Sequence, residues 1–141
     1  MQQHAHQVEE QQQLLFLPSV FNETLDLLFD AHDYFQSRGV EEQSMIPAQY
    51  RPLFSHEMSR ITNRLTNIMA WVMVRKAVCT GRIDEDIACE NYRLDEEVDG
   101  VMDDHEITEM LPYYISYLSE RTRELYTRVE RLDSMAYGTK H

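Results

Sequence analysis

The chain is poor in the residues that build tight turns and cross-links. Of its 141 residues, only four are Gly, four are Pro and two are Cys. This scarcity argues against a many-stranded β sandwich or barrel, because such folds need turn-forming residues at short intervals. Cys79 and Cys89 lack the CxxC spacing and fit a reducing compartment better than a disulfide framework. No alternation of period two appears anywhere, so we expect no β-sheet.

Long apolar runs and an excess of positive charge are also missing. The longest apolar run, residues 68–74, has seven residues, whereas a membrane-spanning helix needs about 20. No basic segment precedes an apolar stretch at the N-terminus, so no secretory signal is visible. The 25 acidic side chains outnumber the 13 basic ones and give a net charge of -12, which argues against nucleic acid or an anionic membrane as partner. We therefore expect a soluble, cytoplasmic protein.

What the chain does contain is helical periodicity in three segments, at about residues 19–38, 53–80 and 108–137. Each segment is followed by a glycine, which takes the left-handed angles of a helix C-terminus without steric cost. Three long amphipathic segments predict an all-α fold, an antiparallel three-helix bundle. The expected core stripes are Phe21, Leu25, Leu28, His32 and Phe35 in the first segment; Phe54, Met58, Ile61, Leu65, Ile68, Val72, Arg75 and Cys79 in the second; and Leu111, Ile115, Leu118, Thr122, Leu125, Val129, Leu132 and Ala136 in the third.

The composition divides the chain into a bundle and two terminal segments. The first 13 residues contain six Gln, which is typical of a disordered tail. The apolar residues 14–17 follow, and we expect them to dock on the bundle or on a second copy. We assign residues 1–17 to a flexible Gln-rich tail with an apolar arm, 18–138 to the bundle and 139–141 to a short tail.

A long acidic connection separates the second and third predicted helices. Residues 82–106 hold eleven acids and two bases, a pattern that favours solvated chain, although the second helix could continue to about Asn91. Within it, the spacing Asp95-x-Glu97-x-Asp99-Gly100-x5-Glu106 matches that of an EF-hand calcium loop. Glu97 is one methylene too long for its position, and the loop has no second hand beside it. A solvated acidic connection is therefore our main reading of residues 95–106, and a calcium- or metal-responsive module is the alternative.

No arrangement of residues predicts catalysis. The chain has no Gly-x-Ser-x-Gly elbow, no Gly-rich phosphate loop and no Glu-x-x-His pair for a di-iron site. His32 lies on an apolar stripe, where a core-edge histidine is a simpler interpretation than a metal ligand. We predict no enzyme, no catalytic or metal-binding residues and no cofactor.

Protein interfaces remain as the candidate functional sites. The second helix is apolar on all sides around residues 68–74, and exposed apolar patches mark interfaces. Tyrosines form a second stripe on the third helix, and the second helix carries a basic face that could dock an acidic partner. The predicted interface residues are Trp71, Met73 and Val74 in the apolar belt, Tyr113 and Tyr117 in the tyrosine stripe, and Arg60 and Arg64 on the basic face.

Two segments carry a resemblance to a known family. The first is EMSRITNRLTNIMAWVMVRKAVCTGRI, with Met58, Arg64, Leu65, Trp71, Ala77, Val78, Gly81 and Ile83 at the matching positions. The second is RELYTRVERLDSM, with Leu125, Tyr126, Val129, Arg131, Leu132 and Asp133. Over about residues 20–137 the chain resembles the RcdA family of alphaproteobacterial regulators of CtrA degradation.

The resemblance implies a three-helix bundle and an adaptor role in regulated proteolysis during the cell cycle. Family members help the ClpXP protease select substrates and are neither enzymes nor cofactor carriers. The implied partners are the ClpX unfoldase, a response-regulator priming factor, a cyclic-dinucleotide-binding co-adaptor and CtrA-like transcription-factor substrates. We also expect a homodimer and a cytoplasmic location, with transient polar localisation. A purely structural dimer remains a further alternative.

Overall fold

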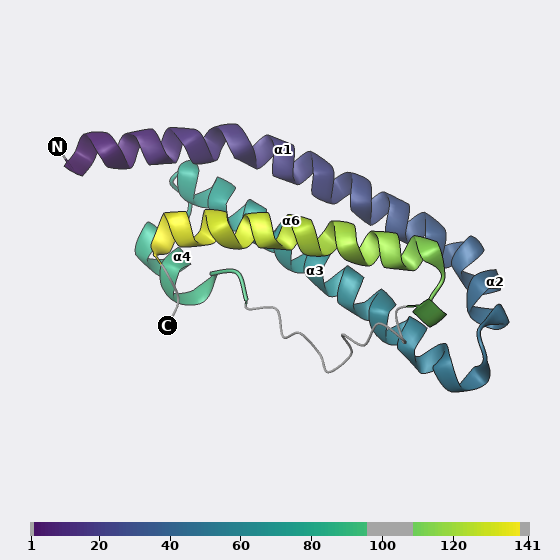
Figure 1. Cartoon of the computed structure of the whole chain (residues 1–141). Coiled ribbons are helices and arrows are strands. Elements are labelled where there is room, and N and C mark those ends of the chain that lie inside the picture. The colour runs from purple at the N-terminus through teal and green to yellow at the C-terminus, as the bar shows by residue number, and fades with distance from the viewer. Residues whose placement is uncertain (1, 96–108, 139–141) are drawn as a thin grey trace.

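The computed structural model describes residues 2–95 and 109–138, with side chains from Phe16 onward. Within these ranges the chain forms helices and no strand, as the sequence predicts (Figure 1). Three long helices make the bundle, and two short helices and a 3-10 turn connect them. The elements are α1 (Gln2–Gln36), α2 (Arg38–Met45), η1 (Ala48–Tyr50), α3 (Arg51–Cys79), α4 (Glu85–Asn91) and α6 (Tyr113–Tyr137).

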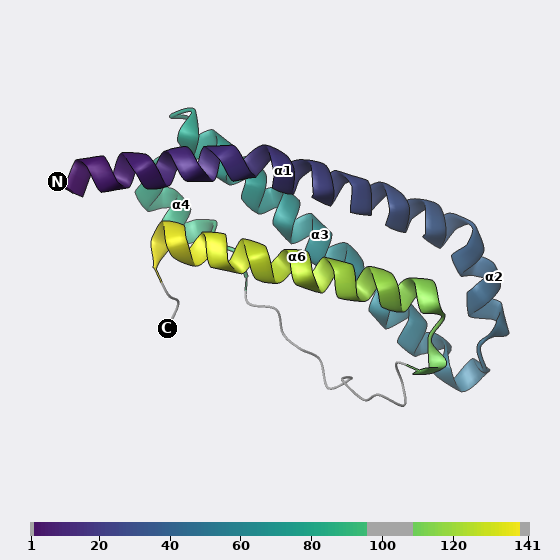
Figure 2. The same cartoon turned by 45° about the horizontal axis from the view of Figure 1, so that its top comes forward.

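The chain directions refine the predicted topology. α1 runs antiparallel to both α3 and α6, whereas α3 and α6 run parallel to each other (Figures 1 and 2). Their contacts show this, because Arg64 bonds Ser119 and Trp71 bonds Asp133, so that the residue numbers rise together on the two helices. Two neighbouring helices can be parallel only if a long connection returns the chain to the starting end. Residues 80–112 are that connection.

Glycine and proline set the helix ends of α3 and α6 largely as predicted. Gly81 and Gly138 have positive φ angles of 77° and 86° and follow the two helices. Pro52 lies in the first turn of α3, and Pro112 immediately precedes α6. The turn at Gly81 ends α3, so the expected continuation to Asn91 is a separate helix, α4.

The first helix differs from its prediction at the N-terminal end. α1 begins at Gln2 rather than at about residue 19, and it includes Pro18. Leu17 is buried against the bundle. The apolar arm was predicted to dock there, and at this residue it does so as part of helix α1. The expected flexibility of residues 1–17 stays a prediction.

The buried stripe of α1 lies one residue earlier than expected. The predicted stripe residues Phe21, Leu28 and Phe35 are only partly buried, and His32 is exposed. Thr24 can enter the core because its hydroxyl donates a hydrogen bond to the Val20 carbonyl at 2.6 Å. The stripe that is fully buried consists of Leu17, Val20, Thr24, Leu27, Ala31 and Tyr34.

The stripes of α3 and α6 form the centre of the core as predicted. Ile61, Leu65 and Ile68 of α3 are completely buried, and so are Leu118 and Leu125 of α6. Burying each such aliphatic side chain contributes about 1.5–3 kcal/mol. This interface therefore fixes the relative position of the two parallel helices.

Gly39 has a different role from the predicted helix cap. It lies inside α2 with an ordinary negative φ, and α1 already ends at Gln36. A Cβ atom at Gly39 would lie 2.8 Å from the Tyr34 carbonyl oxygen. The glycine is needed for this close approach of α2 to the end of α1, and not for a left-handed backbone.

Candidate functional site

Two of the predicted surface residues lie inside the bundle. Trp71 is 3% exposed and Arg64 is 2% exposed, which corrects the expectation that they form part of an open surface. Trp71 lies beside Ile68 and Val72 on the core side of α3, and its indole N–H donates to Asp133 at 3.0 Å. Trp71 of the predicted apolar belt therefore faces the core, where α6 and the chain before Asp95 cover its side chain.

The predicted basic face is a buried polar cluster between α3 and α6. Arg64 donates from Nη1 to the Ser119 carbonyl at 3.2 Å and to the Thr122 hydroxyl at 3.2 Å. Glu57 accepts a hydrogen bond from the Ser119 hydroxyl and pairs with Arg60 at 3.4 Å. Both arginines make contacts within the monomer, and Arg64 is buried, so they do not present an open dock for an acidic partner.

The remaining predicted interface residues are on or near the surface. Tyr113 is 84% exposed, Met73 is 53% exposed and Tyr117 is 41% exposed, whereas Val74 is partly buried. Met73 lies on α3 beside Leu17 of α1, where the two helices border an apolar groove. The two tyrosines lie at the other end of the bundle, so the structure does not unite the three predicted patches.

The tyrosines belong to a larger aromatic surface at the start of α6. The Tyr114 ring lies 5.8 Å from that of Tyr117 and 4.7 Å from that of Tyr34. The guanidinium carbon of Arg38 lies 4.7 Å above the Tyr114 ring and 5.6 Å above the Tyr34 ring. We call Arg38, Tyr113, Tyr114 and Tyr117 the tyrosine surface, and the buried Tyr34 packs against it from the core side. Tyr and Arg are, with Trp, the residues most enriched at the energetic centres of protein interfaces.

Two tyrosines, one in this surface and one packed against it, have raised pKa values. Burial raises the pKa of Tyr34 well above its ordinary value, and the hydrogen bond to Glu42 raises it further. Burial also raises the pKa of Tyr114, with a smaller contribution from the nearby carboxylate of Asp30. A tyrosine of ordinary pKa is also neutral at physiological pH, so these shifts have their effect in alkali. Tyr34 was not predicted here because the expected stripe of α1 was one residue out of register. Arg38 and Tyr114 lie on α2 and α6, and only their contacts with the Tyr34 ring in the folded chain place them at this surface.

A buried carboxylate organises the opposite end of the bundle. Asp133 is 3% exposed and accepts from Trp71 on one oxygen. The Leu94 backbone N–H donates to the same oxygen, Oδ1, at 3.3 Å, and the other oxygen, Oδ2, accepts from Nε and Nη2 of Arg93 at 3.1 and 3.0 Å. We call Trp71, Arg93, Leu94 and Asp133 the Asp133 cluster. It ties the chain after α4 to both α3 and α6.

Arg75 adds a second set of contacts beside the Asp133 cluster. It pairs with Glu85 of α4 at 2.9 Å and donates to the Tyr137 hydroxyl. Arg93 also donates to the Gly138 carbonyl at 2.6 Å. These bonds hold α4 and the end of α6 together, so the described part of the acidic connection has a fixed place on the bundle.

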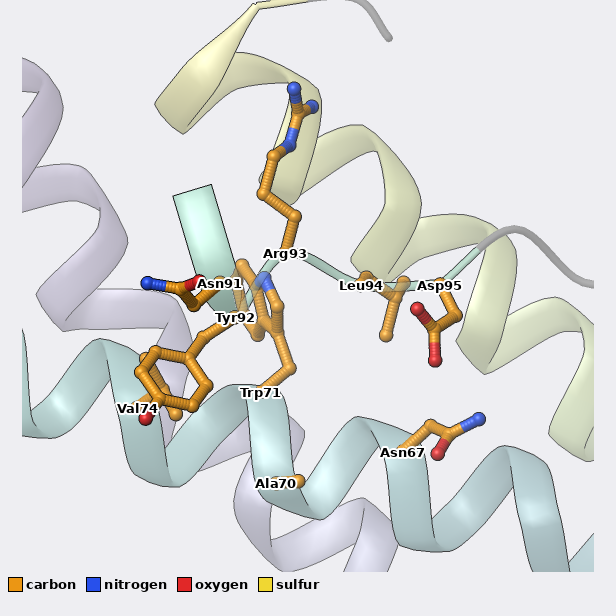
Figure 3. A pocket seen from close by; sticks show the side chains of 9 residues that line it. All are labelled: Asn67, Ala70, Trp71, Val74, Asn91, Tyr92, Arg93, Leu94 and Asp95. Carbon is orange, nitrogen blue, oxygen red and sulfur yellow. The ribbon is translucent and has the colours of Figure 1, made fainter. Parts of the chain in front are cut away.

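A groove lies between α3 and the chain segment that the Asp133 cluster holds (Figure 3). Its volume is about 170 Å³. Residues of α3 form one side, and the end of α4 with the segment after it forms the other. The lining residues are Asn67, Ala70, Trp71, Val74, Asn91, Tyr92, Arg93, Leu94 and Asp95. We call this the α3–α4 groove.

The described residues give no basis for a metal site or a membrane span. Within residues 2–95 and 109–138, no three His, Cys, Asp or Glu side chains cluster as metal ligands. The proposed calcium loop lies outside the described residues except for Asp95, which is exposed. In the same ranges no helix combines the length and hydropathy that crossing a bilayer requires.

The fold defines a class of all-α bundle in which two long parallel helices pack against an antiparallel third. The crystal structure of RcdA from Caulobacter crescentus CB15 is similar, with a TM-score of 0.70 and 24% sequence identity over 89% of this chain and 93% of that chain. At this identity the likeness establishes a shared fold. Residues 8–141 match the family model described as a protein of unknown function, DUF1465, and the chain belongs to that family. A search of curated proteins gave no match.

Proposed function

We propose that this protein is a non-enzymatic adaptor that helps deliver CtrA-like transcription factors to the ClpXP protease. The observation that carries this proposal is the fold shared with RcdA over nearly the whole of both chains. The sequence resemblance to the RcdA family supports the same role through residues that lie in the core of the bundle, including Trp71 and Asp133. The proposed location is the cytoplasm, with transient localisation at a cell pole.

An adaptor of this kind works by tethering. Holding a substrate near the protease raises its effective concentration without strengthening any single contact. The tyrosine surface is our candidate for one of the tethering contacts, because Tyr113 is 84% exposed and directly precedes Tyr114, on whose ring Arg38 stacks. A flat surface of tyrosines provides large contact area at low entropic cost.

The proposed partners are the ClpX unfoldase, a response-regulator priming factor, a cyclic-dinucleotide-binding co-adaptor and the transcription-factor substrate. We also propose that the protein acts as a homodimer, with Met73 as the candidate contact residue because it borders the apolar groove at Leu17. Val74 lines the α3–α4 groove instead. Sedimentation equilibrium of the full chain tests the dimer, and a monomer at micromolar concentration would contradict it.

The delivery function is tested by reconstituted proteolysis. ClpXP, a CtrA-like substrate, the priming factor and the co-adaptor are purified from the same organism, and substrate loss is followed with and without this protein. We expect the protein to accelerate degradation while remaining intact itself. No acceleration at any protein concentration, with all four partners present, would contradict the proposal.

A surface variant locates the contact in the same assay. Tyr113→Ala removes an exposed ring from the tyrosine surface, and we expect a roughly tenfold weaker effect, as for a central interface residue. Phe29→Ala is the matched control, because Phe29 is an exposed aromatic residue on the outer side of α1. Equal activity of the two variants would exclude the tyrosine surface while leaving the delivery function intact.

A further inference from the structure

The α3–α4 groove has the size and lining of a site for one side chain. Its volume of about 170 Å³ is below the roughly 300–1,000 Å³ typical of small-molecule and cofactor sites. Ala70, Val74 and the edge of Trp71 provide an apolar floor along α3 (Figure 3). Such a floor suits an aliphatic side chain inserted from a partner.

Polar groups lie at both ends of this floor. Asn91 lies at one end, near Tyr92 and Val74, whereas Asn67 and Asp95 lie at the other (Figure 3). A carboxamide both donates and accepts hydrogen bonds, so it can pair with the N–H and C=O groups of a peptide backbone. The arrangement suits an extended peptide that lies across α3.

The outer wall of the groove is held in place before anything binds. Asp133 accepts from the Leu94 backbone N–H at 3.3 Å and from Arg93 at 3.0 Å. The Tyr126 hydroxyl donates to the Asp95 carbonyl, and the Leu94 side chain is 4% exposed. A preorganised wall costs little ordering entropy on binding, which favours recognition of short segments.

The charge at the groove is negative. Arg93 points away from the groove toward α6, where Asp133 neutralises it (Figure 3). Asp95 presents an exposed carboxylate beside Asn67. The described segment that forms this wall, residues 82–95, carries five acids (Asp84, Glu85, Asp86, Glu90 and Asp95) against two bases (Arg82 and Arg93). This charge attracts cationic segments and repels acidic ones.

We propose that the α3–α4 groove binds a basic peptide segment of a partner protein. One aliphatic side chain lies over Ala70, Trp71 and Val74, and a neighbouring Lys or Arg pairs with Asp95. Asn67 and Asn91 bond the peptide backbone. This inference goes beyond the proposed adaptor function and does not depend on it, since it concerns a different end of the bundle and a different contact.

Trp71 is the single tryptophan of the chain and lines the groove, so its fluorescence reports occupancy. The full chain is titrated at low salt with the acetylated, amidated pentapeptide Ala-Arg-Leu-Arg-Ala, and calorimetry provides an independent measurement. We expect saturable binding, and at least about fivefold weaker binding when both Arg are replaced by Glu or Leu by Gly. Equal binding of the three peptides, or no binding by either method at millimolar peptide, would overturn the proposal.

Three variants place the binding in the groove. Ala70 is exposed, so Ala70→Arg fills the groove and repels the peptide without disturbing the core, and we expect binding to be lost. Asp95→Asn is expected to weaken binding about threefold. Asp86→Asn, which removes the same charge from an exposed site on α4, is expected to leave it within error of wild type. Equal weakening by Asp95→Asn and Asp86→Asn would show that binding depends on net charge alone, and it would overturn the assignment of the peptide to this groove. Peptide binding and substrate degradation are measured in separate assays. The groove proposal can therefore fail while the adaptor proposal stands, and the reverse.

Discussion

The indole N–H of Trp71 donates a hydrogen bond to Oδ1 of Asp133 at 3.0 Å, which joins the middle of α3 to the last turns of α6. Both residues are 3% exposed. They come from the two separate segments that carry the family resemblance, RLTNIMAWVMV and RVERLDSM. The two segments therefore meet, at these two positions, in one contact in the core of this chain.

Replacing this carboxylate is expected to be costly. Asp133→Asn keeps the size of the side chain, but it removes the charge that pairs with Arg93 and exchanges one acceptor for a donor. Breaking a buried ion pair by changing one partner costs about 3–5 kcal/mol, so we expect a loss of about 3 kcal/mol in the free energy of unfolding. Urea denaturation measures it. Asp86→Asn on exposed α4 is the control, with an expected change below about 0.5 kcal/mol, and a similar small change for Asp133→Asn would contradict the role of the cluster.

An exposed ion pair of the same chemistry should contribute far less. Glu23 of α1 pairs with Arg128 at 2.6 Å and with Arg121 at 3.3 Å on α6. The Arg128 side chain is half exposed and that of Arg121 is partly exposed, and ion pairs open to solvent contribute about 0–1 kcal/mol and are screened by salt. We expect Glu23→Gln to lower the free energy of unfolding by less than about 1 kcal/mol at low salt, and by nothing measurable at about 1 M salt. A loss that is unchanged by salt would show that Glu23 acts through packing.

The two glycines Gly39 and Gly81 should respond differently to substitution. In an open helix Gly→Ala stabilises by about 1 kcal/mol, but a Cβ at Gly39 would lie 2.8 Å from the Tyr34 carbonyl oxygen. We expect Gly39→Ala to destabilise by about 1–3 kcal/mol, and Gly39→Asn to destabilise more. At Gly81 the Cβ has free space but φ is 77°, so Asn should be tolerated better than Ala. Thermal unfolding of the four variants tests this reversal of order.

The buried tyrosines predict a loss of stability in alkali. Burial, and then the hydrogen bond to Glu42, raise the pKa of Tyr34 above its ordinary value of 10.0. Above about pH 10 the unfolded chain releases this proton and the folded chain retains it, so the free energy of unfolding falls as the pH rises. We expect this fall to begin near pH 10 and to continue above it, and to be shallower in Tyr34→Phe, in urea unfolding. Tyr114 and Tyr137, whose pKa values are also raised, account for part of the pH dependence that remains in Tyr34→Phe. The same pH dependence in Tyr34→Phe and in the wild type would contradict the role of Tyr34.

Much of the bundle follows from local pattern in the sequence. The stripes of α3 and α6 were predictable because their apolar side chains repeat at helical spacing with few competing residues on other faces. The stripe of α1 was not, because Phe21, Leu25 and Leu28 form an equally regular pattern beside the true one. The buried pattern includes Thr24 and Tyr34, whose polar groups can be buried only with a hydrogen-bond partner. These partners, the Val20 carbonyl and the Glu42 carboxylate, are not evident from the sequence alone.

The candidate sites were harder to predict than the fold. Trp71 and Arg64 were expected on a surface, because amphipathicity indicates which face is apolar but not how many neighbours cover it. Their buried partners, Asp133 and Ser119, are separated from them by more than fifty residues. The direction of α6 was equally hidden, since it depends on the path of the connection. Polar residues within a predicted apolar stripe, such as Asp133 beside Val129 and Leu132, are the signal that could have indicated a buried cluster.

The polar contacts between α3 and α6 occur at two separate points of their interface, at Arg64 with Thr122 and at Trp71 with Asp133. A shift of one helix past the other by a single turn would place both sets of charged groups against aliphatic side chains at once. The separation between the tyrosine surface and the α3–α4 groove is consequently fixed by the register of the helices. With a rise of about 1.5 Å per residue, Tyr113 and Asp133 lie about 30 Å apart along α6. Two proteins bound at these ends would be held at one distance, and their relative placement would be a property of the bundle itself.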